Sequence, residues 1–143
     1  MSDAILQVSN LEKHFRVGRG KILRAVDNVS FAIQRGKTLG LVGETGAGKT
    51  TTALSILKLI QSPPGRIKSG KIFLGDQELT VCSDKEMQKI RGKRLSMIFQ
   101  DPMTALNPVI TVGNQIAEVI RLHEKCSRAE AEVRASEMLE MVG

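Results

Sequence analysis

The stretch GETGAGKT, residues 43–50, matches the pattern G-x-x-x-x-G-K-[ST] at every fixed position. The apolar run before it, residues 38–42, predicts a short buried strand. The segment after it, residues 51–60, predicts a helix. Its predicted apolar face consists of Ala53, Ile56, Leu57 and Ile60. A strand, a glycine loop and a helix in this order are typical of a phosphate-binding loop, or P-loop.

The residue types in this loop suit a triphosphate, which needs many donors in a small space. Gly46 and Gly48 allow a tight backbone that approaches a ligand closely, with inward N–H groups. The following helix N-terminus adds donors and partial positive charge. Lys49 can reach the β- and γ-phosphates, and the Thr50 hydroxyl is placed to ligate Mg²⁺. The predicted nucleotide-binding residues here are Gly43, Glu44, Thr45, Gly46, Ala47, Gly48, Lys49, Thr50 and Thr51. A chance glycine-rich turn is the alternative, and the flanking elements argue against it.

A second motif runs from Ser96 to Pro102 and continues to Pro108. Residues 97–99 predict a buried strand, and the prolines end regular structure after it. Gln100 at the end of a core strand can reach a metal ion or its water. An ordinary exit from a strand into a loop is the other interpretation of this motif taken alone.

Together these motifs resemble the ATP-binding subunits of ABC transporters, and the resemblance covers essentially the whole chain. The segments MIFQDPMTALNP, residues 97–108, and AVDNVSF, residues 25–31, are similar to the branch that imports dipeptides, oligopeptides and sometimes nickel. The resemblance implies an α/β fold. It would have a P-loop NTPase core, an antiparallel β subdomain and the start of a helical subdomain.

The resemblance also implies roles for two further residues. Gln100 corresponds to the Q-loop residue, so we expect it to be catalytic, to contact Mg²⁺ together with Thr50, and to signal to membrane subunits. Phe15 stands where the family has an aromatic residue that stacks on adenine. The family usually has Tyr there, but stacking needs only a π face. A core position for Phe15, or stacking by His14, remains an alternative.

Several elements that this family needs for hydrolysis have no counterpart in the sequence. They are a Walker B strand ending in Asp with a neighbouring Glu, an LSGGQ-type signature and a switch His. Residues 72–76 superficially resemble an apolar strand ending in Asp, but we interpret them as a strand and a turn. We therefore expect the chain to be the N-terminal part of a longer subunit, truncated before the signature and inactive alone. The intact subunit would be an ABC-type ATPase.

Charge is unevenly distributed along the chain, whose net charge is +6. Residues 1–100 hold 17 Lys and Arg against 8 Asp and Glu, whereas residues 101–143 hold 4 against 7. This shift predicts a boundary near Gln100. Residues 1–100 would be the ATP-binding core with the β subdomain, and residues 101–143 the start of the helical subdomain. Aromatic content of 3%, without interleaved basic and aromatic residues, argues against nucleic acid as a partner.

Cysteine usage and hydropathy predict a location inside the cell. Cys82 and Cys126 are isolated, as expected of a reduced cytosolic chain. No apolar run approaches the ~20 residues of a membrane span, and no signal peptide opens the chain. We therefore expect peripheral attachment to the cytoplasmic face of the cell membrane, through partner subunits.

The predicted function is that of an ATP-binding subunit that couples ATP binding and hydrolysis to import of di- or oligopeptides. ATP and Mg²⁺ would be its cofactors. Its partners would be membrane permease subunits, contacted by the region after Gln100, and a second nucleotide-binding subunit in a homo- or heterodimer. The alternatives are a non-transport P-loop NTPase or kinase, and a nucleotide-binding fragment without turnover.

The remaining pattern predicts strands and helices around these motifs. Strands are expected at residues 5–10, 29–34 and 71–74, with a turn at residues 18–21. Helices are expected at residues 83–91 and 111–123, the second with Ile116, Val119, Ile120 and His123 on one face. A capping box at Ser127 and Glu130 opens a last helix that extends to Met141.

Overall fold

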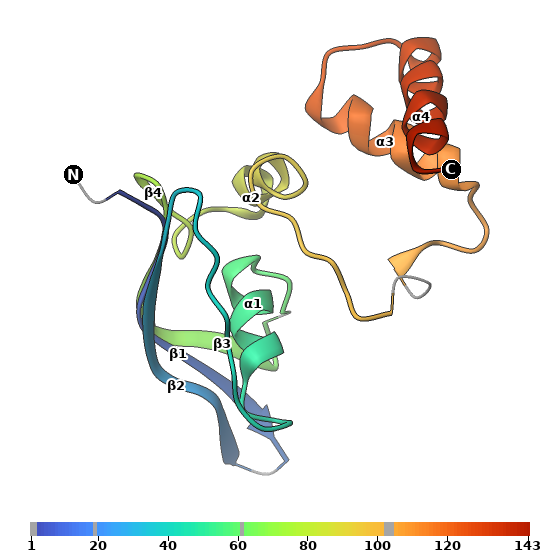
Figure 1. Ribbon diagram of the computed structural model, residues 1–143. Coiled ribbons are helices and arrows are strands. Elements are labelled where there is room, and N and C mark those ends of the chain that lie inside the picture. The colour runs from blue at the N-terminus through green and yellow to red at the C-terminus, as the bar shows by residue number, and fades with distance from the viewer. Residues whose placement is uncertain (1–2, 19, 61, 102–104) are drawn as a thin grey trace. The chain divides into compact units, whose positions relative to one another are not determined.

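The computed structural model describes residues 3–18, 20–60, 62–101 and 105–143. The chain forms two compact units, Met1–Gln88 and Lys89–Gly143 (Figure 1). Arg19 in the predicted turn, and Pro102, Met103 and Thr104 in the second motif, lie outside the described residues. The domain boundary that charge predicts near Gln100 stays a prediction.

The first unit is built on an antiparallel sheet. Its strands are β1 (Ala4–Val17), β2 (Lys21–Gln34), β3 (Gly65–Leu74) and β4 (Gln77–Glu78). Their order is β2-β1-β3-β4, and all three pairings are antiparallel. The three predicted strands are therefore confirmed, although each extends beyond its predicted bounds. Gly75 and Asp76 form the turn between β3 and β4, as predicted.

Helix α1 (Lys49–Ile56) contacts β1 and β2. The buried apolar residues of this unit include Val8 and Leu11 of β1, Ile72 of β3 and Leu79 after β4. In β2 the predicted alternation is confirmed, since residues 29, 31 and 33 are half-buried while 30, 32 and 34 are exposed. The sheet and α1 thus share one hydrophobic core.

Helix α1 ends earlier than predicted, at Ile56 rather than at residue 60. Lys58 has φ +51°, its N–H donates to the Ser55 carbonyl, and the Leu59 N–H donates to the Leu54 carbonyl. These two bonds form a Schellman motif, which satisfies the last carbonyls and turns the chain away. Ile60 of the predicted apolar face therefore lies beyond the helix, whereas Ile56 and Leu57 are buried and Ala53 is half-buried.

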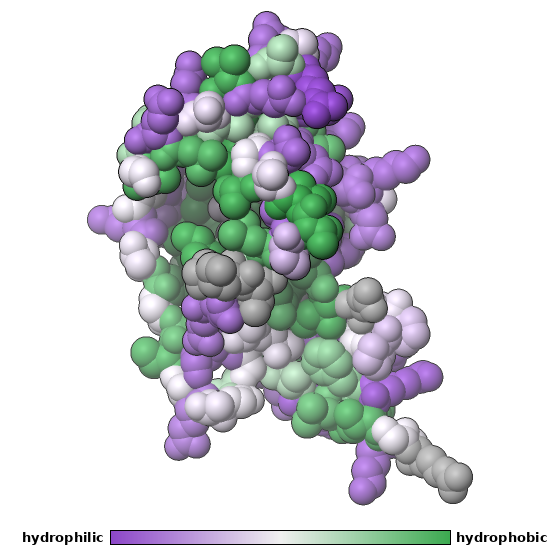
Figure 2. Space-filling view, turned by 90° about the vertical axis from the view of Figure 1, so that its right-hand side faces the viewer, coloured by the Kyte–Doolittle hydropathy of each residue, from purple (hydrophilic) through white to green (hydrophobic). Residues whose placement is uncertain are grey.

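Two predicted core strands are not formed. Residues 38–42 and 97–99 have no regular structure, and Val42 and Ile98 are each 94% exposed. A strand is stable when neighbouring strands satisfy its N–H and C=O groups. Among the described residues, the sheet ladders pair only β1 to β4, so these segments have no such neighbour. Apolar side chains at the molecular surface are green in Figure 2.

The second unit contains α3 (Val112–His123) and α4 (Arg128–Val142), which follow α2 (Asp84–Ile90) in the chain. All three helices are confirmed to within a residue or two. The core between α3 and α4 consists of Ala117, Ile120, Ala131 and Ala135, with Ile116 and Cys126 packed against it. Ile116, Val119, Ile120 and His123 line one groove and therefore share a face of α3, as predicted, although Val119 is 48% exposed.

The capping box of α4 forms as predicted. The Ser127 hydroxyl accepts from the Glu130 N–H, and the Glu130 carboxylate accepts from the Ser127 N–H at 2.7 Å. These bonds satisfy orphan donors at the helix start. Cys82 and Cys126 are both free thiols. None of the helices in the described ranges has the length and apolar character to cross a bilayer.

Candidate functional site

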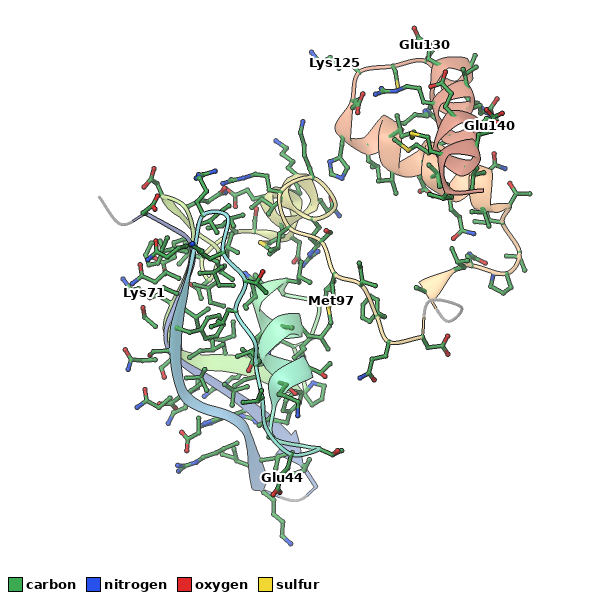
Figure 3. All side chains as sticks on the ribbon, in the orientation of Figure 1. Glu44, Lys71, Met97, Lys125, Glu130 and Glu140 are labelled. Carbon is green, nitrogen blue, oxygen red and sulfur yellow. The ribbon has the colours of Figure 1, made fainter. Side chains whose placement is uncertain are left out.

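The glycine loop leads directly into α1. Gly46 and Gly48 both have φ +85°, and Gly48 is the N-cap of the helix. This left-handed conformation strains any residue with a Cβ, so both glycines are required by the backbone itself. The alternating backbone turns of such a loop direct successive N–H groups toward one point, which is the geometry of an anion nest. Figure 3 labels Glu44, which lies at the end of the sheet where β1 leads to β2.

Gly48 has a second constraint, which is steric. A Cβ at this position would project onto the carbonyl oxygen of Ala25 in β2, well inside contact distance. Around Gly46, by contrast, no atom of the residues that the structure describes lies within 4 Å of such a Cβ. The loop therefore rests on the main chain of β2 at Gly48. Sequence reasoning missed this contact, because a main-chain carbonyl has no side-chain signature.

Lys49 holds the loop closed. Its Nζ donates to the carbonyls of Gly43 and Glu44, each at 2.7 Å. The Ala47 N–H also donates to the Glu44 carbonyl at 3.1 Å. The ammonium group is thus held against the loop, where an anion bound by the N–H groups would be within its reach.

The threonines after the lysine differ in their environment. Thr50 is exposed and Thr51 is half-buried. Thr52 is buried, and its hydroxyl donates to the Gly48 carbonyl at 2.9 Å. Thr50 is therefore the hydroxyl of this turn most accessible to a ligand. The glycine loop, the ammonium and the exposed hydroxyl together fit a phosphate group with its metal ion.

Phe15 lies at the same end of the sheet as the loop. It pairs with Leu23 of β2, two residues from the Ala25 carbonyl that contacts Gly48. Its ring covers Gly65 of β3, where an added Cβ would stand 2.6 Å from Cε1. Phe15 is half-buried and lines a cavity of about 170 Å³ with Ile22 and Pro64.

The alternative residue, His14, is more deeply buried. It is 8% exposed, and its Nε2 has no hydrogen-bond partner in the described part of the chain. The nearest acid is Glu12, whose Oε2 lies 3.6 Å from that nitrogen. A ring enclosed in this way presents less of its face to a ligand than Phe15 does.

Gln100 belongs to the second unit, whereas the P-loop residues and Phe15 belong to the first. The side chain of Gln100 is exposed, and it follows the irregular segment 96–99. The structure thus brings Lys49 onto Gly43 and Glu44 and places Phe15 at the same sheet end. The role of Gln100 stays a prediction.

Several known proteins are similar to this chain. Residues 26–143 match the family described as ABC transporter. The chain is 48% identical over 139 residues to the oligopeptide transport ATP-binding protein OppD of Bacillus subtilis, covering 97% of this chain and 38% of OppD. AppD of the same organism, also an oligopeptide transport ATP-binding protein, is 48% identical over 139 residues, covering 97% of this chain and 42% of AppD. The chain thus spans less than half of these relatives.

A third relative and a solved structure are also similar to this chain. The glutathione import ATP-binding protein GsiA of Shigella flexneri is 47% identical over 143 residues, covering 96% of this chain and 23% of GsiA. The dimeric structure of the ATP-binding cassette MJ0796 in a post-hydrolysis state, bound to ADP and Pi, matches 95% of this chain and 56% of its own. The TM-score is 0.76 at 24% identity, which shows the fold alone. With its family match and its P-loop, this chain belongs to the ABC transporter family and has the fold of an ATP-binding cassette.

Proposed function

We propose that this chain is part of the ATP-binding subunit of an ABC importer for di- or oligopeptides. The observation that carries the proposal is the 48% identity to OppD and AppD, both named as oligopeptide transport proteins. The subunit would couple ATP binding and hydrolysis to import. Membership of the ABC transporter family disfavours the alternative of an unrelated kinase.

In this proposal the loop from Gly43 to Thr51 binds the phosphates of ATP. Lys49 exchanges its two carbonyl acceptors for β- and γ-phosphate oxygens, which form charge-assisted and therefore stronger hydrogen bonds. Thr50 and Gln100 hold Mg²⁺, which when bound neutralises charge on the β- and γ-phosphates. Gln100 acts as the catalytic Q-loop residue, and Phe15 stacks on adenine.

We further propose that residues 1–100 form the ATP-binding core and residues 101–143 the start of the helical subdomain. The region after Gln100 would contact the permease subunits, which would hold the protein at the cytoplasmic face of the membrane. An apolar groove of about 740 Å³ in the second unit, lined by Leu106, Val112 and Ile116 among others, supports this role. A second nucleotide-binding subunit, identical or different, would complete the assembly.

The test begins with ATP binding by calorimetry to the parent chain, Lys49→Ala and Lys37→Ala. Lys37 is an exposed lysine outside the loop, so its variant matches the charge change. A charge-assisted contact is worth about 1.5–3 kcal/mol, so Lys49→Ala is expected to weaken binding about ten- to a hundredfold. Equal affinity in the parent and Lys49→Ala would contradict the site. In the intact transporter, Lys49→Ala is expected to abolish uptake of a labelled peptide, and continued uptake would contradict the function.

A further inference from the structure

The hairpin between β1 and β2 exposes aliphatic side chains at its tip. We define the hairpin tip as residues 16–24, of which the structure describes all except Arg19. Val17 is 44% exposed, Leu23 53% and Ile22 63%. Figure 1 shows this tip at the end of the sheet, where β1 leads to β2. Aliphatic residues that cluster at an exposed position in this way indicate a contact with a partner.

The hairpin tip is also basic. Arg16, Lys21 and Arg24 are exposed, and the sequence of residues 16–24 contains no Asp or Glu. Two acids lie toward this end of the sheet. They are Asp27, whose Oδ2 is 3.9 Å from Nη1 of Arg24, and Glu44, which Figure 3 labels. The first 100 residues hold 17 Lys and Arg against 8 Asp and Glu, so the field around the tip favours an anionic partner.

The register of the strands places aliphatic and cationic side chains on both faces of the hairpin tip. Arg16 lies opposite Ile22, and Val17 lies opposite Lys21. Residues directly opposite in an antiparallel pair share a face, and successive residues of a strand point to opposite faces. One face therefore has Arg16 with Ile22, and the other has Val17 with Lys21. A flat protein surface would cover only one of these faces, whereas a bilayer interface surrounds a tip that enters it end-on.

The aliphatic residues also favour lipid over nucleic acid as the anionic partner. Proteins bind nucleic acid through phosphate contacts and through aromatic side chains that stack on bases, and neither uses an exposed Val, Ile or Leu. An anionic bilayer interacts with both parts of the tip. Its headgroups attract Lys and Arg, and its acyl boundary accepts aliphatic side chains.

We propose that the hairpin tip binds the surface of an anionic phospholipid bilayer. Arg16 and Lys21 lie at the headgroup phosphates, and Val17 and Ile22 enter the boundary with the acyl chains. This contact belongs to the chain itself. It needs neither ATP in the P-loop nor the proposed permease subunits, so it can fail or hold independently of the proposed transport function.

Cosedimentation with vesicles tests the proposal, using equal parts of phosphatidylcholine and phosphatidylglycerol, and phosphatidylcholine alone for comparison. We expect the full chain to bind the anionic vesicles, to bind the neutral ones weakly, and to lose affinity as salt rises. Arg16→Gln and Lys21→Gln are each expected to weaken binding about fivefold, the effect of one cation at an anionic surface. Ile22→Ser is expected to weaken it about five- to tenfold through lost apolar burial.

Two exposed residues of the first unit outside the hairpin tip provide matched controls. Lys37→Gln removes a cation beyond the other end of β2, and Val81→Ser removes an aliphatic side chain that is 76% exposed. Both are expected to bind as the parent does. Lys49→Ala is also expected to bind normally, because headgroup phosphates are not held by the P-loop.

The proposal is overturned if the parent does not bind anionic vesicles at low salt, or if Ile22→Ser binds them as the parent does. It is also overturned if Lys37→Gln loses as much affinity as Lys21→Gln, or if Lys49→Ala loses binding. If duplex DNA binds and anionic vesicles do not, and Lys21→Gln weakens that binding, the tip is a nucleic-acid contact and the membrane assignment is wrong.

Discussion

The carbonyl oxygen of Ala25 lies in the space that a Cβ on Gly48 would occupy. Gly48 is therefore fixed both by its left-handed backbone and by the strand behind it. Gly46 has the same φ of +85°, but none of the described residues lies within 4 Å of a Cβ added there. A substitution at Gly46 therefore tests backbone strain alone, whereas one at Gly48 tests backbone strain together with a steric clash.

Gly48→Ala is expected to destabilise the protein more than Gly46→Ala. Both substitutions incur the strain of a left-handed non-glycine residue, about 1–2 kcal/mol. Gly48→Ala also forces the loop away from Ala25, and such overpacking adds about 1–3 kcal/mol. Urea unfolding of the two variants measures the difference. Equal free energies of unfolding would mean that the loop does not rest on β2.

Phe15→Leu is expected to weaken ATP and ADP binding to a similar extent, whereas Phe15→Tyr is expected to preserve both. Leucine still covers Gly65 with an apolar side chain but has no π face. Loss of a base stack costs about 1–3 kcal/mol by substitution. Because stacking does not involve the γ-phosphate, ATP and ADP lose affinity alike. Nucleotide titrations that show unchanged affinity for Phe15→Leu, but reduced affinity for His14→Ala, would identify His14 as the stacking residue.

Lys13→Met is expected to raise the free energy of unfolding at neutral pH, by an amount that shrinks as pH rises. The pKa of Lys13 lies below its ordinary value of 10.5 in the folded protein, chiefly because the residue is buried. Between these two pKa values the unfolded chain binds more protons than the folded chain, so the parent gains stability with rising pH. The gap between parent and variant is thus largest below the folded pKa and is expected to close toward pH 10.5.

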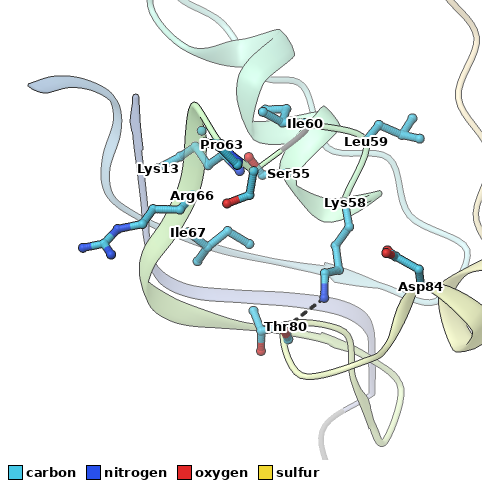
Figure 4. Close-up of a pocket in the computed structure, with 12 residues that line it drawn as sticks. Lys13, Ser55, Lys58, Leu59, Ile60, Pro63, Arg66, Ile67, Thr80 and Asp84 are labelled. Atoms are coloured by element: carbon cyan, nitrogen blue, oxygen red, sulfur yellow. Dashed lines mark hydrogen bonds between the residues drawn. The ribbon is translucent and has the colours of Figure 1, made fainter. Parts of the chain in front are cut away.

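Lys13 lines a cavity of about 790 Å³ in the first unit (Figure 4). The other charged groups that line it, Lys58, Arg66 and Asp84, are the same in both proteins. Their titration therefore cancels to first order when parent and variant are compared. Urea unfolding across this pH range, with Lys68→Met as the control, measures the gap. A gap that stays constant with pH, or a variant less stable than the parent at neutral pH, would contradict a charged Lys13 that burial destabilises.

Local sequence signals predicted the local structure well. The capping box at Ser127 and Glu130 and the alternation along β2 depend on residues near one another in the chain, and both are confirmed. The strands at residues 38–42 and 97–99 were predicted from apolar runs alone. A strand also needs a neighbour, and no local pattern reports whether one is present.

In the candidate site, too, features set by local sequence were predicted, whereas features set by distant neighbours were not. The glycine pattern predicted a tight backbone at Gly46 and Gly48, and both residues have φ +85°, a conformation that glycine adopts without strain. The contact with Ala25 and the burial of Lys13 arise from the packing of β2 and from shifts of register in β1. Because lysine is hydrophilic, the sequence alone predicts that Lys13 is exposed. Its burial follows from the register shifts in β1, which no local pattern reports.

We expect the chain of 143 residues to bind ATP without turning it over. In the proposed site Lys49 and Thr50 would position phosphate and metal, but phosphoryl transfer also requires a group that orients the attacking water and a further metal ligand. The sequence has no apolar strand that ends in an Asp-Glu pair. Gln100 does not replace such a base, because a neutral amide accepts no proton. General-base catalysis typically contributes about 10²–10⁴-fold in rate.

A phosphate-release assay on the purified chain tests this expectation, with Lys49→Ala as the control for contaminating ATPases. Release that is equal in the parent and in Lys49→Ala comes from a contaminant and agrees with the prediction. Release that depends on Lys49 at a rate typical of a transport ATPase would overturn it. A catalytic base would then lie within these 143 residues. The candidates are Glu44 in the glycine loop, Asp101 in the second motif, and Asp76 at the end of the strand and turn that resemble a Walker B element. Substituting each by its amide would identify it, since only the true base would lose turnover while keeping ATP affinity.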